Sequence, residues 1–174
     1  MRCAECGAVL PGDESCLDRF HALLAAEVDN RELARMHGLT VLTYHVQHPS
    51  RTKPWIQVAG YAALRRAFNE GQDWLQVLRE ENQQARVNRL KASVGATMPP
   101  GIAPGPVEGE LTVAAVDPTA PSGQAEIVLA WARSVAAGRV SNSAAASTGA
   151  RLSAGRRSRA GTPSRSSEAR RRPR

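Results

Sequence analysis

The chain has 174 residues, 42% of them hydrophobic, and a formal net charge of +7. No run of about 18 or more apolar residues occurs, so we expect no membrane span. No charged stretch followed by an apolar segment opens the sequence, so we expect no secretory signal and a cytoplasmic protein. In a reducing compartment its three cysteines favour metal binding or free thiols over disulfides.

The positive charge is confined to the end of the chain. Residues 139–174 hold ten arginines and a single acid, Glu168, whereas residues 1–138 carry a net charge of −2. From about Gly138 onward the sequence is mostly Ser, Ala, Gly and Arg, which bury too little apolar surface to offset the entropy of ordering. We therefore predict a helical domain over residues 1–137 and a disordered tail over residues 138–174.

Two helices are predicted at the start of the domain. Apolar residues at helical spacing predict the first over residues 16–28, ending before Asn30. Its apolar stripe comprises Phe20, Leu23, Leu24 and Val28. The second is predicted over residues 32–48, where Pro49 ends it because proline disfavours α geometry in the preceding residue. β-branched residues make a strand over residues 39–46 the alternative, but the length of the segment favours a helix.

Two further helices are predicted in the middle of the chain. The third follows Pro54 and stops at Gly71. Its inward positions are expected to be Ile56, Ala59, Gly60, Ala63, Leu64, Ala67 and Phe68. Asp73 is expected to cap the fourth, over residues 74–94, whose second half is mostly polar.

The end of the domain is less regular in sequence. A Pro/Gly linker is expected over residues 98–110, without regular structure. Residues 109–117 fit either a short extended piece or a brief helix capped by Thr112. A last helix is predicted after Ser122 as its N-cap, and it carries Trp131 on its apolar face. These elements predict an all-α protein, a small irregular bundle of four to five helices.

A cysteine motif opens the chain. Cys3 and Cys6 have the spacing of a zinc knuckle, and Gly7 permits the positive φ that such a turn often needs. Cys16 supplies a third thiol. Three free thiols without a metal, or a CxxC redox pair, are the alternatives; no strand precedes the motif as it does in thioredoxin-like sites. We favour structural zinc.

Helix geometry selects a fourth ligand. If the first two helices form an antiparallel hairpin that turns near Asn30, Cys16 lies 14 residues before the turn, His45 lies 15 after it and His48 lies 18 after it. At about 1.5 Å per residue, Cys16 and the His45/His48 end are level to within roughly one turn. We therefore predict a Cys3His site of Cys3, Cys6, Cys16 and His48, with His45 as the substitute ligand.

The remaining histidines fit this ion poorly. His37 lies eleven residues from His48, about 16 Å along a helix, so both cannot bind one metal. His37 is expected to be a hydrogen-bonded histidine between helices. His21 lies far around the first helix from Cys16. The alternative role for His48 itself is a helix C-terminal residue that interacts favourably with the helix dipole.

Several motifs occur together and resemble a known family. They are CAECG, Cys16, the stretch His37-Gly38-Leu39-Thr40-Val41, YHVQHP at residues 44–49, LTVAAV and WARSV. The combination resembles a bacterial family of small proteins known only as a domain of unknown function, with an N-terminal CxxC, a later cysteine, a histidine that opens a helix and a YxxQHP element. The resemblance covers roughly residues 3–137, and the tail departs from it. It marks Cys3, Cys6, Cys16, His37, Tyr44, Gln47, His48 and Pro49 and implies no activity.

Three functions are compatible with these residues. The first, which we favour, is a zinc-stabilised helical protein that acts as a binding or regulatory module, with an unknown protein as its possible partner. The second is a metal-dependent enzyme with an open zinc site at Cys3, Cys6 and His48, beside Tyr44, Gln47 and His45 as polar helpers. The third is weak, nonspecific nucleic-acid binding through the arginine-rich tail. No P-loop or HExxH motif is present, so an enzyme is not favoured.

Overall fold

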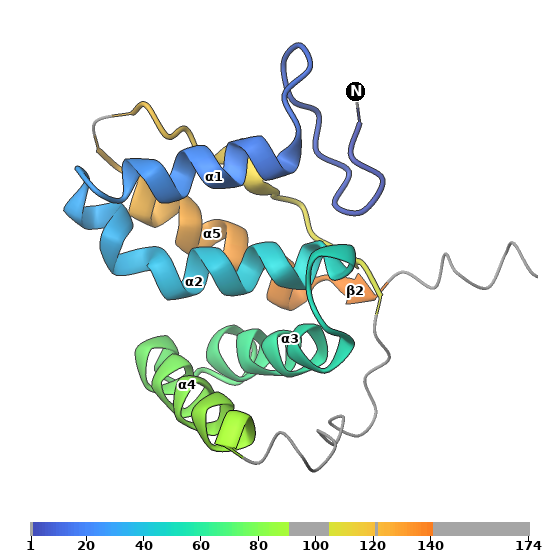
Figure 1. The fold of residues 1–174 in the computed structure, drawn as a ribbon, viewed down its shortest axis with the longest axis vertical. Helices are drawn as coiled ribbons and strands as arrows, with labels where there is room; N and C mark the ends of the chain where they lie inside the picture. Colours follow the sequence, from blue (N-terminus) through green and yellow to red (C-terminus); the bar gives the residue numbers. More distant parts are fainter. Residues whose placement is uncertain (1, 91–104, 121, 141–174) are drawn as a thin grey trace, which may run out of the picture. The chain divides into compact units, whose positions relative to one another are not determined.

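A computed structural model describes residues 2–90, 105–120 and 122–140 (Figure 1). The described residues all belong to one compact unit, Met1–Ser143. The predicted disordered tail beyond residue 140 and the first half of the predicted linker lie outside the described residues. Among the described helices, none is both long and apolar enough to cross a membrane.

Five α-helices make up the described part of the chain, so the predicted all-α class is confirmed. The first, α1, spans Cys16–Ala26 and begins at a capping box, in which Ser15 and Asp18 exchange hydrogen bonds with each other's backbone N–H. It ends two residues earlier than predicted, and Val28, predicted to face inward, is 84% exposed. α1 ends early because Asn30 caps the second helix. An N-cap residue has an extended backbone, so the chain must leave the helical conformation before Asn30.

The second helix, α2, spans Arg31–Gln47, and the Asn30 side chain accepts hydrogen bonds from two of its first N–H groups. The strand alternative for residues 39–46 is therefore wrong. The helix stops one residue earlier than predicted, with His48 as its C-cap, and a short 3₁₀ helix, η1, follows at Pro49–Arg51. His48 thus lies at a sharp change in chain direction, which fixes its side chain at the end of the helix.

The next two helices lie on the side of α2 that is opposite α1 (Figure 1). α3 spans Pro54–Phe68 and α4 spans Trp74–Leu90, where Asp73 accepts hydrogen bonds from the N–H groups of the first turn, as predicted. The buried face of α3 also includes Gln57, Val58 and Tyr61, which were not predicted. The reason is that α3 packs against both α4 and α5, so more of its surface is covered than a single apolar stripe provides.

Residues after the described gap form small elements before the last helix. β1, Val107–Glu108, pairs antiparallel with β2, Arg139–Val140, so the absence of regular structure predicted for residues 98–110 is wrong at this point. This pair also extends the ordered elements past the predicted boundary at residue 137. The brief-helix alternative for residues 109–117 is confirmed, because the 3₁₀ helix η2, Val113–Ala115, is capped by Thr112.

The last helix, α5, spans Gln124–Ala137. Its predicted N-cap, Ser122, is wrong: Gly123 holds that position with a left-handed backbone, φ +79°. The Gln124 side chain stabilises the start of α5. It accepts a hydrogen bond from the Asp117 N–H at 2.9 Å and donates one to the Ser122 carbonyl. α5 then packs along α2 and α3, while α1 lies beside α2 (Figure 1).

The core lies where α2 and α5 meet. Trp131 on α5 and Tyr44, Leu33 and Leu39 on α2 are at most 1% exposed. The segment before α1 reaches this core as well, since Ala8 and Leu10 belong to the same apolar cluster. The N-terminal segment is therefore packed on the helices and is not a separate appendage.

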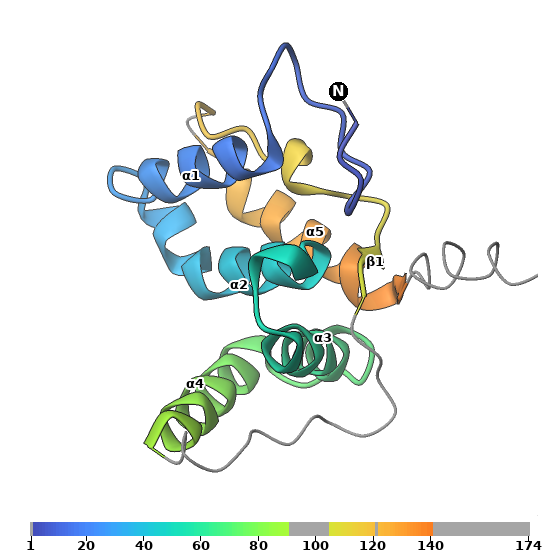
Figure 2. The ribbon, with the colours of Figure 1, turned by 45° about the vertical axis from the view of Figure 1, so that its right-hand side comes forward.

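The turn from α5 into β2 requires glycine, and we predict that Gly138→Ala is destabilising by about 1–3 kcal/mol. A Cβ at this position would collide with the carbonyl oxygen of Glu108 on the paired strand, seen beside the end of α5 in Figure 2. Gly38→Ala is the control: its nearest contact is the flexible end of Leu78 at 3.3 Å, and alanine favours the helix by about 1 kcal/mol. Urea unfolding of both variants measures the difference, and equal costs would contradict the prediction.

Candidate metal centre

The N-terminal segment forms a tight hydrogen-bonded turn around its first two cysteines. The Cys3 N–H donates to the Ala8 carbonyl at 2.8 Å, and the Gly7 N–H donates to the Cys3 carbonyl at 3.1 Å. Gly7 has φ +75°, the conformation that the sequence predicts for it. An antiparallel bridge between Arg2 and Val9 closes the loop. We call residues 2–10 the knuckle.

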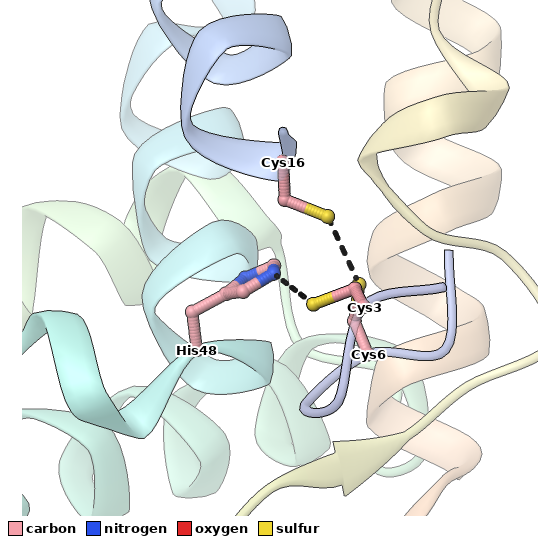
Figure 3. A group of neighbouring side chains, drawn as sticks. All are labelled: Cys3, Cys6, Cys16 and His48. Carbon is pink, nitrogen blue, oxygen red and sulfur yellow. Dashed lines mark hydrogen bonds between the residues drawn. The ribbon is translucent and has the colours of Figure 1, made fainter. Parts of the chain in front are cut away.

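Three separate segments bring four side chains together (Figure 3). Cys3 and Cys6 come from the knuckle, Cys16 is the first residue of α1, and His48 follows the last residue of α2. Their ligand atoms all lie within 4.8 Å of one another. Cys6 Sγ and Cys16 Sγ lie 3.5 Å apart, and Cys3 Sγ and His48 Nε2 lie 3.8 Å apart.

These separations fit one tetrahedral ion. With metal–sulfur bonds of about 2.3 Å and metal–nitrogen bonds of about 2.0 Å, two sulfurs of a tetrahedron lie roughly 3.8 Å apart, and a sulfur and a nitrogen lie roughly 3.5 Å apart. The Cys6–Cys16 and Cys3–His48 separations, 3.5 and 3.8 Å, each differ from the matching value by about 0.3 Å. Small movements of the side chains would therefore let the four residues hold a metal ion.

The orientation of His48 suits a metal ligand. Its Nδ1 lies 2.9 Å from the Tyr44 carbonyl oxygen, which can only accept, so Nδ1 carries the proton and Nε2 offers its lone pair to the cluster. Burial lowers the pKa of His48, and the hydrogen bond to Tyr44 only partly opposes this. The imidazole is thus held neutral, which is the form that binds metals.

Burial of the cysteines makes their thiolate forms depend on a nearby positive charge. Burial raises the pKa of Cys6 to about 11 and also raises the pKa of Cys16. Burial likewise acts to raise the pKa of Cys3, but hydrogen bonds from the backbone of Cys6 and Glu5 lower it overall. Two buried thiolates would be unstable at neutral pH without a compensating charge, and a bound metal cation supplies that charge.

Two contacts fix the surroundings of the cluster. The Tyr44 ring stacks between His48, with ring centroids 4.2 Å apart, and Phe20, at 4.0 Å. Both carboxylate oxygens of Glu5 accept hydrogen bonds from Ser50, one from its N–H at 3.0 Å and one from its hydroxyl at 2.9 Å. The knuckle is thereby attached to η1 as well as to the helices. No motif in the sequence pairs these two residues, which lie 45 positions apart, and the sequence analysis missed them.

The other predicted site residues lie outside the cluster. His45 presents the edge of its ring to Phe20 and Tyr44, and its buried Nδ1 has no hydrogen-bond partner among the described residues. His37 is exposed, and its Nδ1 lies 2.5 Å from Glu27 Oε2 at the end of α1. The structure therefore does not bring either histidine to the other three ligands.

Gln47 also has its contacts elsewhere. It is fully buried, accepts a hydrogen bond from the Trp131 indole N–H at 2.8 Å and donates to the Leu111 carbonyl at 3.1 Å. These contacts link the end of α2 to α5 and to the segment before η2. Its polar groups are satisfied by the fold, which differs from the helper role expected for it beside an open metal site.

A comparison with curated proteins finds no match, and a comparison with solved structures finds none either. The model of a family of unknown function, DUF5946, matches residues 1–138, which include the knuckle and the five described helices. The resemblance noted in the sequence thus extends over the whole helical domain, and the chain belongs to the DUF5946 family.

Proposed function

We propose that this protein is a zinc-stabilised helical module that binds or regulates a partner protein. The observation that carries the proposal is the convergence of four protein ligands, Cys3, Cys6, Cys16 and His48, within 4.8 Å. Four ligands fill a tetrahedral zinc ion and leave no position for a substrate, which is the arrangement of structural sites. Three thiolates and one imidazole also favour zinc over magnesium or calcium, which prefer oxygen ligands.

The energetic role of zinc here is to fasten the knuckle to the helical bundle. The knuckle contributes only a few buried side chains, Cys6, Ala8 and Leu10, to the core. Structural zinc supplies on the order of 10 kcal/mol of apparent binding energy in small zinc-finger peptides. A metal bond to α1 and another to the end of α2 would therefore outweigh the apolar contacts of the knuckle.

The enzyme alternative needs an open metal position, and the position of Cys16 argues against it. An active zinc at Cys3, Cys6 and His48 would hold a water as its fourth ligand. Cys16 Sγ lies 3.5 Å from Cys6 Sγ, where it can take that fourth place. Absorption spectra of the cobalt-substituted protein distinguish the two cases, because a closed site of three thiolates gives intense sulfur-to-cobalt bands that do not change when competing anions are added.

The proposal is tested by metal analysis of the purified full-length protein together with a count of reactive thiols. We expect one zinc per chain and thiols that react only slowly until a chelator and denaturant are added. Addition of the chelator alone should lower the melting temperature. A metal-free protein that melts unchanged in the chelator would disprove the zinc proposal, and a different metal in the same four-ligand site would correct only its identity.

The arginine-rich tail carries a second proposal, weak nonspecific binding to nucleic acid. Its ten arginines can neutralise phosphates, whereas residues 1–138 carry a net charge of −2. Truncation after Val140, which keeps β2, should abolish binding to duplex DNA in a fluorescence anisotropy titration. If six phosphates are contacted, the affinity of the full-length chain should fall about a thousandfold between 50 and 200 mM salt. Equal affinity of the truncated chain would assign the binding to the helical domain.

A further inference from the structure

The four ligands differ in their access to solvent. Cys6 and Cys16 are each 7% exposed and His48 is 2% exposed, whereas Cys3 is only partly buried. A cavity of about 290 Å³ lies against the cluster, and Cys3 lines it while Cys6 does not. Arg2, Tyr44 and Arg51 form further parts of its wall. A small molecule in solvent therefore meets the Cys3 sulfur before it meets the sulfur of Cys6.

We propose that Cys3 is an oxidation site through which hydrogen peroxide, arriving by this cavity, releases the zinc. The inference rests on the proposed zinc centre and adds its regulation. Cys16 also lines the cavity, but its side chain is buried, so Cys3 is the sulfur that peroxide reaches first. Partial exposure of a thiolate, together with a second thiol nearby, is the setting in which cysteines act as reversible redox sensors.

The chemistry takes two steps. In the first, the Cys3 thiolate attacks one oxygen of hydrogen peroxide, the O–O bond breaks, and sulfenic acid forms with loss of hydroxide. In the second, a thiolate of Cys6 or Cys16, both within 4.8 Å, attacks the Cys3 sulfur and expels a second hydroxide as the disulfide forms. The two sulfurs together lose two electrons, and peroxide gains them and becomes two water molecules after protonation.

The disulfide removes two of the four ligands, so the remaining thiol and His48 no longer hold the ion in a closed site. The knuckle then keeps its internal turn and the exposed contact between Glu5 and Ser50. A Cys3–Cys6 disulfide lies within the knuckle and permits its release, whereas a Cys3–Cys16 disulfide would tie the knuckle to α1. Ala8 and Leu10 are buried against the apolar cluster, so release of the knuckle after Cys3–Cys6 oxidation would uncover apolar surface. Oxidation at one sulfur is thereby converted into a change of surface that a partner protein can detect.

The experiment uses the zinc-loaded full-length chain, hydrogen peroxide, a zinc-binding dye and dimedone, which traps sulfenic acids. Without dimedone, we expect one zinc released for each disulfide formed and two thiols lost per zinc. With dimedone, mass spectrometry should place most of the label on Cys3. The unfolded, metal-free chain is the control, and it should be labelled at all three cysteines because burial no longer separates them.

A pair of variants tests entry through the cavity. Leu17 lines the cavity, whereas Leu75 lies on α4 and is 44% exposed. Leu17→Trp should narrow the cavity and slow zinc release, and the matched change Leu75→Trp should leave the rate as in the wild type. Equal rates in zinc-loaded Leu17→Trp and wild type would overturn entry by this route.

The outcomes separate this inference from the zinc proposal. Absence of zinc before peroxide is added refutes the proposed metal centre itself. Bound zinc that survives peroxide with three intact thiols, under conditions that oxidise the unfolded control, overturns the redox inference alone. Dimedone found mainly on Cys6 or Cys16 overturns it too.

Discussion

The His48→Asn variant is expected to purify with little zinc and to melt at a lower temperature, whereas His45→Asn should keep its zinc and lose little stability. The two histidines lie three residues apart at the end of α2, so the pair is closely matched. Only His48 places a ring nitrogen in the cluster, 3.8 Å from Cys3 Sγ, with its other nitrogen fixed by the Tyr44 carbonyl. Metal analysis and thermal unfolding measure both effects.

The size of the effect follows from ligand linkage. A site filled at a thousand times its Kd stabilises the folded state by about 4 kcal/mol, so His48→Asn should lose up to this amount in excess zinc. With a chelator present, the gap between His48→Asn and wild type should shrink, because neither protein then holds the ion. The reverse pattern, with zinc lost from His45→Asn and kept in His48→Asn, would make His45 the fourth ligand.

The Gln47→Leu variant is expected to be less stable than the wild type by roughly 2–4 kcal/mol, with its zinc content unchanged. Leucine has a similar volume, so the cost comes from hydrogen bonds. The substitution leaves the indole N–H of Trp131, which is fully buried, without its acceptor at 2.8 Å. It also removes the Gln47 donor, at 3.1 Å, from the Leu111 carbonyl, which keeps only the longer hydrogen bond from the Ser134 hydroxyl at 3.5 Å. Urea unfolding measures the loss in free energy.

The control for this prediction is a double-mutant cycle with Trp131→Phe. Phenylalanine has no N–H to satisfy, so Gln47→Leu should cost about 1–3 kcal/mol less in that background than in the wild type. Additive costs would show that the hydrogen bond between Gln47 and Trp131 contributes little. A folded Gln47→Leu protein that has lost its zinc would instead place Gln47 in the metal centre.

The sequence was sufficient to predict the candidate metal cluster because its geometry is local. Two helices joined by a short turn have a register that residue counting fixes, so Cys16 and His48 could be placed at one end of a hairpin. The cap at Asn30, a side chain typical of helix starts, determines where that turn lies. The choice of His48 over His45 depended on less than one helical turn, and in the structure His48, the C-cap of α2, is the histidine that lies with the three cysteines.

The features that the sequence did not predict depend on distant segments. The pairing of Val107 with Val140 joins two-residue strands, which are too short for a periodic pattern. Gln57 is buried because it bonds the backbone of Gly105 and the Val46 carbonyl, partners that no local pattern indicates. At the start of α5, the sequence predicted Ser122 as the cap, but the contact of Gln124 with Asp117, seven residues earlier, accompanies a cap at Gly123.

The position of the ligands along the chain bears on the order in which the protein assembles during synthesis. All four lie between residues 3 and 48, whereas α5, which supplies Trp131 to the core, begins at Gln124. A nascent chain thus presents the complete ligand set long before the helix that covers α2 is made. Because short sequence separations favour early contacts, the knuckle, α1 and α2 can capture the ion first and offer α5 a prepared surface.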